Sequence, residues 1–286
     1  MKPDGVVITG ASTGIGAASA RHLDRLGFRV FAGIRKSQDG ERLRAQTSSK
    51  LTPIRFDVTD DGSIAAAADT IRAALDGDGL AGLVNNAGIA VPGPIETVPL
   101  AEARKQFEVN VLGQIAVTQA FLPLLRQGRG RIVNIGSIAG LTATPFLGLY
   151  GASKFALEAL TDALRVEVRP WGINVSIIEP GAIASSIWQG SAARGDAISA
   201  TLDPAARALY AESMAALREV AKKTEQRAIS PEGVAEAVVH ALTATRPRTR
   251  YLVGTDAKIR AFLKTVLSDR MQDKMVSWFL GLQTRL

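Results

Sequence analysis

The sequence predicts a protein of the α/β class, in which one parallel β-sheet carries helices on both of its faces. Short apolar runs alternate along the chain with longer segments of helical periodicity. The apolar runs are nearly continuous, which is typical of strands that are buried on both sides. No repeat or linker divides the 286 residues, so one large core is expected.

The first half of the chain contains four expected strands and three expected helices. The strands are apolar runs at residues 6–10, 29–33, 51–58 and 80–84. Small residues predict a closely packed helix at 14–26, and Asp60 is a typical N-cap for the alanine-rich helix that ends at Leu75. A long helix is expected at 106–125.

The second half continues the alternation. Three further strands are expected at residues 131–135, 173–178 and 251–253. Periodicity predicts a helix at 148–168, and Ser230 with Pro231 begins another that ends near Leu242. The alternation favours a Rossmann-like, doubly wound sheet of seven parallel strands with right-handed crossovers.

Composition excludes several kinds of site. The chain contains no cysteine, which rules out disulfides, cysteine-ligated zinc and cysteine nucleophiles. Its two histidines, His22 and His240, are too few for a His-rich site, so no metal is expected. A charged fraction of 21% with 47% hydrophobic residues argues against disorder.

The net charge of +7 is concentrated at one end of the chain. Residues 246–286 contain nine basic and three acidic residues and carry +6, so the rest is nearly neutral. No Lys/Arg run or zinc-knuckle spacing accompanies this charge, so nucleic acid is not an expected partner. The chain begins without a signal peptide, and its longest uncharged stretch, 132–153, is too polar to span a membrane. We therefore expect a cytoplasmic protein.

A glycine-rich turn follows the first strand and opens the first helix. It reads Thr9-Gly10-Ala11-Ser12-Thr13-Gly14-Ile15-Gly16. Glycines in such a turn let the backbone approach a pyrophosphate, and the N-terminus of the helix supplies N–H groups and a favourable dipole. The spacing is G-x-x-x-G-x-G, which differs from the general dinucleotide fingerprint G-x-G-x-x-G.

A tyrosine and a lysine four residues apart, Tyr150 and Lys154, lie on one face of the helix expected at 148–168. A nearby ammonium lowers the pKa of a phenol, which makes Tyr150 a candidate proton donor to a carbonyl or base toward an alcohol. Ser137 follows the fifth strand, and open α/β sheets bind ligands at the carboxyl ends of their strands. We expect the Ser137 hydroxyl to share the substrate oxygen with Tyr150.

Together these motifs resemble those of the short-chain dehydrogenase/reductase family over nearly the whole chain. In order, they are the glycine-rich turn, Asp57-Val58, Asn85-Asn86-Ala87-Gly88, Asn110, Ser137, Tyr150-x-x-x-Lys154 and Pro180-Gly181. The segment 250–258 and the helical tail after it resemble the 17β-hydroxysteroid and retinol dehydrogenase branch of that family.

The resemblance implies a role for each matching residue. The catalytic residues would be Asn110, Ser137, Tyr150 and Lys154, with Asn110 supporting a water-linked proton path from Lys154. The residues that bind a nicotinamide cofactor would be Gly10, Ser12, Thr13, Gly14, Ile15, Gly16, Arg35, Lys36, Asp57, Val58, Asn86, Ala87, Gly88, Tyr150, Lys154, Pro180, Gly181, Ile183 and Ser185. Ser185 stands where many family members have threonine.

The end of the second strand bears on which nicotinamide cofactor binds. An acidic residue there accepts the ribose hydroxyls of NAD, whereas a nearby arginine suits the extra phosphate of NADP. Ile34 occupies the acidic position, and Arg35 and Lys36 follow it. Because isoleucine cannot bind ribose hydroxyls and a guanidinium can grip phosphate with two N–H groups, we expect NADP(H) to be preferred over NAD(H).

We divide the chain into a single Rossmann-like domain at 1–255 and a basic amphipathic helical extension at 256–286. Residues 182–230 correspond to the substrate lid of the family. The lid carries large apolar side chains, among them Ile187 and Trp188, which favour an apolar substrate.

The extension repeats apolar residues at helical spacing, with basic residues between them and a break at Ser268-Asp269. Three interpretations stay open for it. The extension packs on the domain or on a partner subunit, covers the substrate pocket, or lies on an anionic membrane surface.

The expected activity is an NADP(H)-dependent oxidoreductase that interconverts a carbonyl and a secondary alcohol by hydride transfer. The resemblance favours a bulky lipophilic substrate of steroid or retinoid type and a homodimer or homotetramer. Two alternatives stay open: a 3-oxoacyl (carrier protein or coenzyme A) reductase, which uses the same residues, and a non-catalytic NADP sensor or scaffold.

Overall fold

A parallel sheet of seven strands forms the centre of the computed structural model, which describes residues 4–282 apart from the side chain of Ser186. The strands are β1 (Gly5–Ile8), β2 (Arg29–Ile34), β3 (Leu51–Arg55), β4 (Leu80–Asn85), β5 (Arg131–Ile135), β6 (Asn174–Pro180) and β7 (Arg250–Val253). They lie in the order β3-β2-β1-β4-β5-β6-β7, and every neighbouring pair is parallel. The predicted α/β class and seven-stranded parallel sheet are confirmed.

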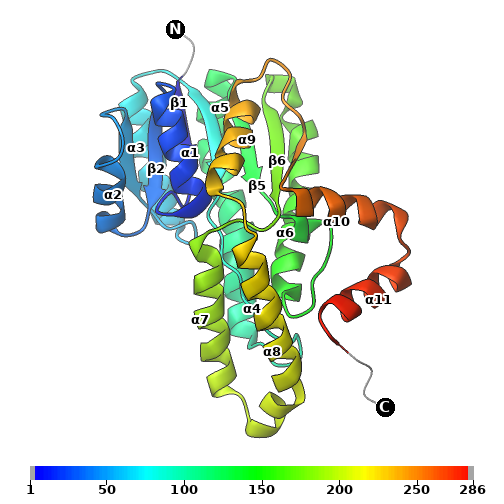
Figure 1. Ribbon diagram of the computed structural model, residues 1–286. Coiled ribbons are helices and arrows are strands. Elements are labelled where there is room, and N and C mark those ends of the chain that lie inside the picture. Colours follow the sequence, from blue (N-terminus) through cyan, green and yellow to red (C-terminus); the bar gives the residue numbers. More distant parts are fainter. Residues whose placement is uncertain (1–3, 283–286) are drawn as a thin grey trace.

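Helices cover both faces of the sheet (Figure 1). The helices of one face are α1 (Gly14–Arg25), α2 (Ser37–Arg44) and α9 (Pro231–Thr243), and their buried residues form one core cluster with the strands. The helices of the other face are α3 (Asp61–Leu75), α5 (Gly113–Gly128) and α6 (Gly148–Glu167), which share a second cluster. Every strand of this doubly wound arrangement ends at the same edge, where a ligand site is expected.

One connection of the sheet has the opposite hand to the expected one. α1 leads from β1 to β2, whereas α9 leads from β6 to β7, in the other direction across the sheet. The two helices nevertheless lie on the same face and pack against each other. The crossover through α1 is right-handed, as β-α-β crossovers usually are. A crossover on the same face that runs in the opposite direction has the opposite hand, so the crossover through α9 is left-handed. The prediction of right-handed crossovers is wrong here, where two long helices are inserted between β6 and α9.

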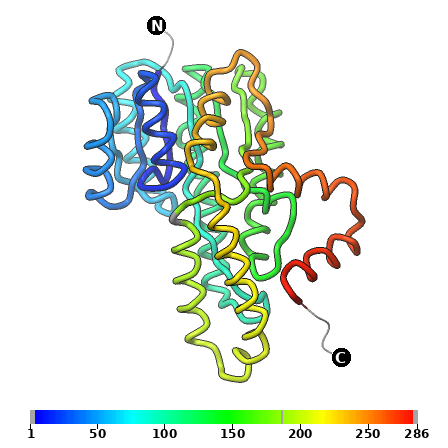
Figure 2. The backbone as a smooth tube through the Cα atoms, viewed as in Figure 1, coloured from blue at the N-terminus to red at the C-terminus, as the bar shows by residue number. Residues whose placement is uncertain are grey.

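The inserted helices are α7 (Ser186–Thr201) and α8 (Pro204–Gln226), within the region expected as the substrate lid. They form a hairpin that extends beyond the carboxyl end of the sheet, as Figure 2 shows, and an ion pair between Arg218 and Asp196 joins them. The hairpin contacts a loop of the domain. The ring of Tyr210 on α8 and the ring of Phe146 in that loop lie 6.3 Å apart in an edge-to-face arrangement. The lid is therefore a pair of helices, and Ile198 of α7 joins it to the domain in a buried cluster with Val91 and Val98.

One long helical stretch, Leu100–Gly128, combines α4 (Leu100–Phe107), a π-helical segment η1 (Glu108–Leu112) and α5. Among residues 4–282 it alone has the length and composition to cross a membrane. Its side chains Val117, Phe121 and Leu125 are completely buried in the cluster beneath the sheet. We therefore interpret the stretch as a core helix, which is apolar because it packs against the sheet.

The extension forms two helices, α10 (Thr255–Val266) and α11 (Asp269–Phe279), which confirms the break near Ser268. α10 packs on the domain through buried Ala257 and through Arg260, whose guanidinium donates to the hydroxyl of Thr142 at 2.6 Å. The outward face of both helices exposes large apolar side chains, namely Ile259, Phe262, Val266, Met271, Met275, Trp278 and Phe279. Arg285, part of the predicted basic tail, lies outside the described residues.

A buried acidic pair lies beneath the carboxyl end of β6. Glu179 on β6 is completely buried, and Glu158 on α6 is nearly so. Arg250 on β7 contacts both, with Nη2 3.0 Å from Glu158 Oε2 and Nε 3.3 Å from Glu179 Oε1, and it also binds Asp162 at 2.8 Å. Burial and the neighbouring Glu158 carboxylate raise the pKa of Glu179 to about 7.

This raised pKa predicts that the protein loses stability as the pH rises. An unfolded glutamate titrates near pH 4.3, so from there up to about pH 7 only the folded chain retains the proton on Glu179. We expect the free energy of unfolding to fall by about 1–3 kcal/mol between pH 5 and pH 8. Chemical denaturation across this range should show the fall in the wild type and little of it in Glu179→Gln. The exposed Glu41→Gln is the matched control, and an unchanged slope in Glu179→Gln would contradict the assignment.

Candidate active site

β1 and β4 are neighbours in the sheet, so their carboxyl ends lie side by side. The direction of the strand order reverses between these two strands. Thr9, at the end of β1, accepts hydrogen bonds on Oγ1 from the backbone N–H groups of Asn86 and Ala87, both at 2.9 Å. Asn86 returns two bonds from Nδ2 to the carbonyls of Thr9 and Gly10, at 2.9 and 3.0 Å. These four hydrogen bonds fix the geometry of the opening between the two strands, which is where doubly wound sheets bind ligands.

The glycine-rich turn needs its glycines for two different reasons. Gly10 and Gly14 have φ values of 63° and 55°, a left-handed conformation that favours glycine. Gly16 has an ordinary backbone, but a Cβ there would lie 2.4 Å from the carbonyl oxygen of Gly10 and 2.5 Å from Asn86 Nδ2. The turn can therefore hold its backbone N–H groups against a ligand while α1 packs closely behind it. These features fit a dinucleotide pyrophosphate.

A cavity of about 400 Å³ runs along the carboxyl ends of the strands. The structure brings most of the predicted site residues into its wall: Gly10, Ser12, Thr13, Gly14, Ile15, Arg35, Asp57, Val58, Asn86, Ala87, Gly88, Ser137, Tyr150, Lys154, Pro180, Gly181, Ile183 and Ser185. They come from segments that follow β1 to β6, so one continuous surface joins the glycine-rich turn to the tyrosine–lysine pair.

Three predicted residues do not line this cavity. Gly16 lies behind the turn, where it permits the close packing described above. Lys36 is the N-cap residue of α2, and its exposed side chain lies outside the cavity wall. Asn110 is completely buried.

Asn110 acts on the site through the backbone. It lies in η1, and its Oδ1 accepts from the N–H of Ile89 at 2.9 Å, while its Nδ2 donates to the carbonyl of Ile89 and to Ser153 Oγ, both at 3.0 Å. Ser153 in turn donates to the carbonyl of Tyr150 at 2.7 Å. The amide of Asn110 thus positions the loop after β4 and the tyrosine helix, while the expected proton path through Asn110 stays a prediction.

Three side chains form the reactive part of the cavity. Tyr150 and Lys154 are 5% and 4% exposed on α6, and Ser137 lies above the end of β5. Ser137 caps the short helix η2 (Ile138–Gly140) by accepting from the N–H of Ala139 at 3.1 Å. It also forms a hydrogen bond with Tyr150, which works against the effect of burial on the phenol. The two hydroxyls can therefore meet a single oxygen of a ligand.

The protonation of this group differs from the expectation. Burial raises the pKa of Tyr150 above its ordinary value, and the hydrogen bond with Ser137 only partly offsets this. Burial lowers the pKa of Lys154 to about 8, with Glu158 opposing the shift. The Lys154 ammonium donates to the carbonyl of Ile135 at 2.7 Å and lies 5.8 Å from the Tyr150 ring centre. The direction of the tyrosine pKa shift is thus opposite to the predicted lowering, because burial of the phenol sets it.

The lid supplies the apolar wall opposite the reactive group. Trp188 on α7 meets the Tyr150 ring edge-to-face with ring centres 6.0 Å apart, and Ile187 packs in the same cluster. Ser191 and Arg194, further along α7, line the same cavity. The sequence did not predict Arg194 as a site residue, because it belongs to no motif. Its place in the cavity wall follows from the fold.

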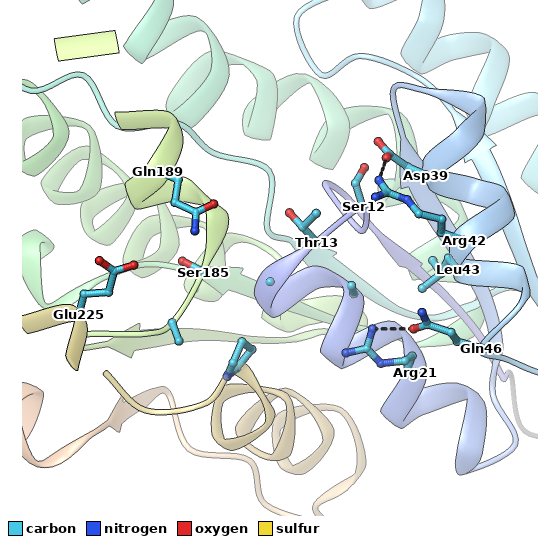
Figure 3. A pocket seen from close by; sticks show the side chains of 14 residues that line it. Ser12, Thr13, Arg21, Asp39, Arg42, Leu43, Gln46, Ser185, Gln189 and Glu225 are labelled. Atoms are coloured by element: carbon cyan, nitrogen blue, oxygen red, sulfur yellow. Dashed lines mark hydrogen bonds and ion pairs between the residues drawn. The ribbon is translucent and has the colours of Figure 1, made fainter. Parts of the chain in front are cut away.

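A second cavity, of about 460 Å³, opens on the other side of the glycine-rich turn. Figure 3 shows Ser12 and Thr13 of the turn facing Arg42 of α2, which pairs with Asp39. Arg35, at the end of β2, lines the first cavity nearby. Arg21 of α1 also lines the second cavity, so three guanidinium groups stand near the turn, and Arg21 and Arg42 were not predicted.

The start of the extension packs against the end of the cavity that Pro180 and Gly181 form. Asp256, in the first turn of α10, accepts from the N–H of Ala182 at 2.8 Å. A Cβ on Gly181 would lie 2.1 Å from Asp256 Oδ1, so only glycine allows this approach. In contrast, no described residue of α10 or α11 lines either cavity, so the interpretation of the extension as a pocket cover gains no support.

The fold and this site define an oxidoreductase of the Rossmann-like class. A glycine-rich turn at a helix N-terminus, at the point where strand order reverses, is joined by one cavity to a buried tyrosine, serine and lysine. Neither of the two histidines, His22 and His240, lines a cavity, and His240 Nδ1 lies 2.9 Å from the hydroxyl of Tyr251.

Comparison with known proteins agrees with this class. The family model of the short chain dehydrogenases matches residues 4–195, and the chain belongs to this family. It is 38% identical over 281 residues to mouse (Mus musculus) retinol dehydrogenase 5, covering 96% of this chain and 88% of that protein. It is 35% identical over 274 residues to an NADPH-dependent 3-dehydrocapnine reductase of Ornithobacterium rhinotracheale, covering 94% of each.

Among solved structures, a short chain dehydrogenase/reductase of Burkholderia phymatum in complex with NAD is similar. Its TM-score is 0.78 at 25% identity, with 96% of this chain and 95% of that chain covered. The resemblance to the retinol dehydrogenase branch is thus confirmed at the level of sequence, and a nicotinamide cofactor is the ligand of the fold. The relatives include proteins named or solved with NADPH and with NAD.

Proposed function

We propose that this protein is an NADP(H)-dependent oxidoreductase that interconverts a carbonyl and an alcohol on a lipophilic substrate. The alcohol is secondary for a ketone such as a ketosteroid and primary for a retinoid aldehyde. The observation that carries the proposal is the buried group of Ser137, Tyr150 and Lys154, which opens into the same cavity as the glycine-rich turn. The bound nicotinamide would supply or accept the hydride at the substrate carbon.

The side chains of this chain would manage the proton and the substrate oxygen. The Tyr150 hydroxyl would donate its proton to the oxygen of a carbonyl, or accept one from an alcohol. Its raised pKa keeps it protonated near neutral pH, which suits reduction. Ser137, already hydrogen-bonded to Tyr150, would hold the same oxygen, and Lys154 would bind the nicotinamide ribose.

The preference for NADP(H) is supported by the charges near the turn. Ile34 offers no carboxylate to the ribose hydroxyls, and Arg35 lines the cavity beyond it. Arg42 adds a second guanidinium on the other side of Ser12. A 2′-phosphate would be held by such groups through charge-assisted hydrogen bonds. The named NADPH dependence of one relative points the same way.

A lipophilic substrate is supported by the wall that the lid presents to Tyr150. Ile187, Trp188 and Ala90 form an apolar cluster with Tyr150 itself. The retinol dehydrogenases among the relatives support a retinoid-like or steroid-like compound. Intact Ser137, Tyr150 and Lys154 favour an enzyme over a sensor or scaffold.

A turnover screen with NADPH tests this proposal. Purified protein would be assayed with retinal, a ketosteroid, a 3-oxoacyl thioester and a small aliphatic ketone, following NADPH absorbance. We expect retinal or the ketosteroid to give the highest kcat/KM. A clear preference for the thioester would replace the proposed substrate class by the 3-oxoacyl alternative, and no turnover with any of the four would contradict the proposal.

The remaining expectations about the protein's surroundings stay predictions. They are a cytoplasmic location, a homodimer or homotetramer, and contact of the extension with a subunit or an anionic membrane. The exposed apolar face of α10 and α11 is compatible with either contact. Sedimentation with and without anionic vesicles would separate the two.

A further inference from the structure

Arg194 places a positive charge at the lid end of the main cavity. Four charged residues of the described chain line this cavity, namely Arg35, Asp57, Lys154 and Arg194. The first two follow β2 and β3, at the end expected for the adenosine, and Lys154 belongs to the reactive group. Arg194 alone comes from the lid, so the proposed cofactor does not account for it.

The helical position of Arg194 turns it toward the interior. Ile187, Ser191, Arg194 and Ile198 follow one another at intervals of three or four residues, which places them on one face of α7. Ile187 packs in the Tyr150 cluster, and Ser191 and Ile198 are buried. The Arg194 side chain is only 24% exposed. A half-buried guanidinium between buried neighbours requires a reason, because burial of a charge is costly without partners.

The protein itself provides a partner for only one of the three nitrogens of this guanidinium. Within residues 4–282, the one ion pair of Arg194 joins its Nε to Glu102 Oε2 on α4, at 3.4 Å. Glu102 is absent from the cavity wall, whereas Arg194 lines it. The carboxylate therefore engages only Nε, and neither Nη group has a hydrogen bond or ion pair with a described residue, which leaves both for an acceptor.

We infer that Arg194, together with the Ser191 hydroxyl, binds an anionic group of the substrate, such as a carboxylate or a phosphate. The substrate class is then an amphiphile, with an apolar body against Ile187 and Trp188 and an acidic group that meets Arg194. This inference rests on the proposed function, since it concerns the compound whose carbonyl meets Tyr150.

Matched pairs of ketones test the inference. The probes are 4-oxodecanoate, 5-oxodecanoate and 6-oxodecanoate, each beside its methyl ester, which has a similar shape and no charge. With NADPH, we expect kcat/KM of the wild type for at least one acid to exceed that for its ester by about tenfold or more. Arg194→Gln should lower kcat/KM for that acid by about 10–100-fold and change the ester value by less than about twofold.

Three further variants separate anion binding from a structural latch. Arg218→Gln removes an exposed arginine of the same lid that pairs with Asp196, so it should keep the acid preference. Arg194→Lys retains the charge without the planar fork and should keep part of the preference. Glu102→Gln breaks the same ion pair as Arg194→Gln, but it should keep or increase the preference because the guanidinium remains.

The outcomes distinguish this inference from the proposed function. If the esters are reduced as well as the acids, or if Arg194→Gln affects both equally, the inference about Arg194 is overturned while the oxidoreductase function stands. If Glu102→Gln and Arg194→Gln lose the acid equally, Arg194 is only a latch, which also overturns it. If none of the six compounds is reduced while retinal or the ketosteroid is, the inference about Arg194 is overturned and the proposed function stands. If none of these compounds is reduced, with NADPH or NADH, the proposed function itself is contradicted.

Discussion

Replacing Tyr150 by phenylalanine should lower kcat/KM for the best carbonyl substrate by about 10²–10⁴-fold, the usual contribution of a positioned acid or base. The phenol is the one acidic group whose hydroxyl both lines the cavity and bonds with Ser137. The phenyl ring keeps the edge-to-face contact with Trp188, so the lid and the core should remain in place. NADPH oxidation in the presence of the ketone is the measurement.

Cofactor binding provides the control for this variant. Quenching of tryptophan fluorescence by NADPH should give nearly the same Kd for Tyr150→Phe and the wild type, since the phosphate contacts are distant from the phenol. Unchanged turnover in the variant, with binding intact, would show that another group moves the proton and that the assigned mechanism is wrong.

Replacing Arg35 by aspartate should reverse the choice of cofactor. The variant removes a guanidinium near the expected 2′-phosphate and places there a carboxylate that repels the phosphate. Loss of a charge-assisted contact, together with the new repulsion, should lower the ratio of kcat/KM for NADPH to that for NADH by about 100-fold. Initial rates with each cofactor at fixed substrate measure this ratio.

The matched control is Arg44→Asp. Arg44 lies at the end of α2 and is exposed, and it lines neither cavity, so the same charge change there should leave the cofactor ratio nearly unaltered. Arg42→Gln should weaken NADPH binding by less than Arg35→Asp does. Comparable kcat/KM for the two cofactors in the wild type would contradict the NADP(H) preference from the outset.

The parts of the fold that could be predicted are those marked by local patterns. Buried parallel strands are continuous apolar runs, and all seven were found from them. The glycine-rich turn and the tyrosine–lysine pair were also visible, because each chemical requirement fixes residues that are near one another in the sequence. Ser137 could be joined to them only through its place after a strand, where parallel strands bring their ends together.

The missed features depend on contacts that are distant in the sequence. α2 has few apolar residues and contains Gly40, which permits close packing because a Cβ there would lie 2.7 Å from Ile34 Cδ1 and 2.9 Å from Pro53 Cβ. The role of Asn110 depends on the π-helical segment that turns it to Ile89 and Ser153. Arg194 and Arg42 belong to no motif, so only the cavities reveal them.

The central claim is that this chain reduces a carbonyl with hydride from NADPH while Tyr150 supplies the proton. The most direct test uses NADPH with deuterium at both positions of the nicotinamide C4, incubated with the best ketone from the screen. Mass spectrometry of the alcohol should find one deuterium on the carbinol carbon with the wild type, and almost no alcohol with Tyr150→Phe. Alcohol formed without deuterium, or formed equally well by the variant, would contradict the claim.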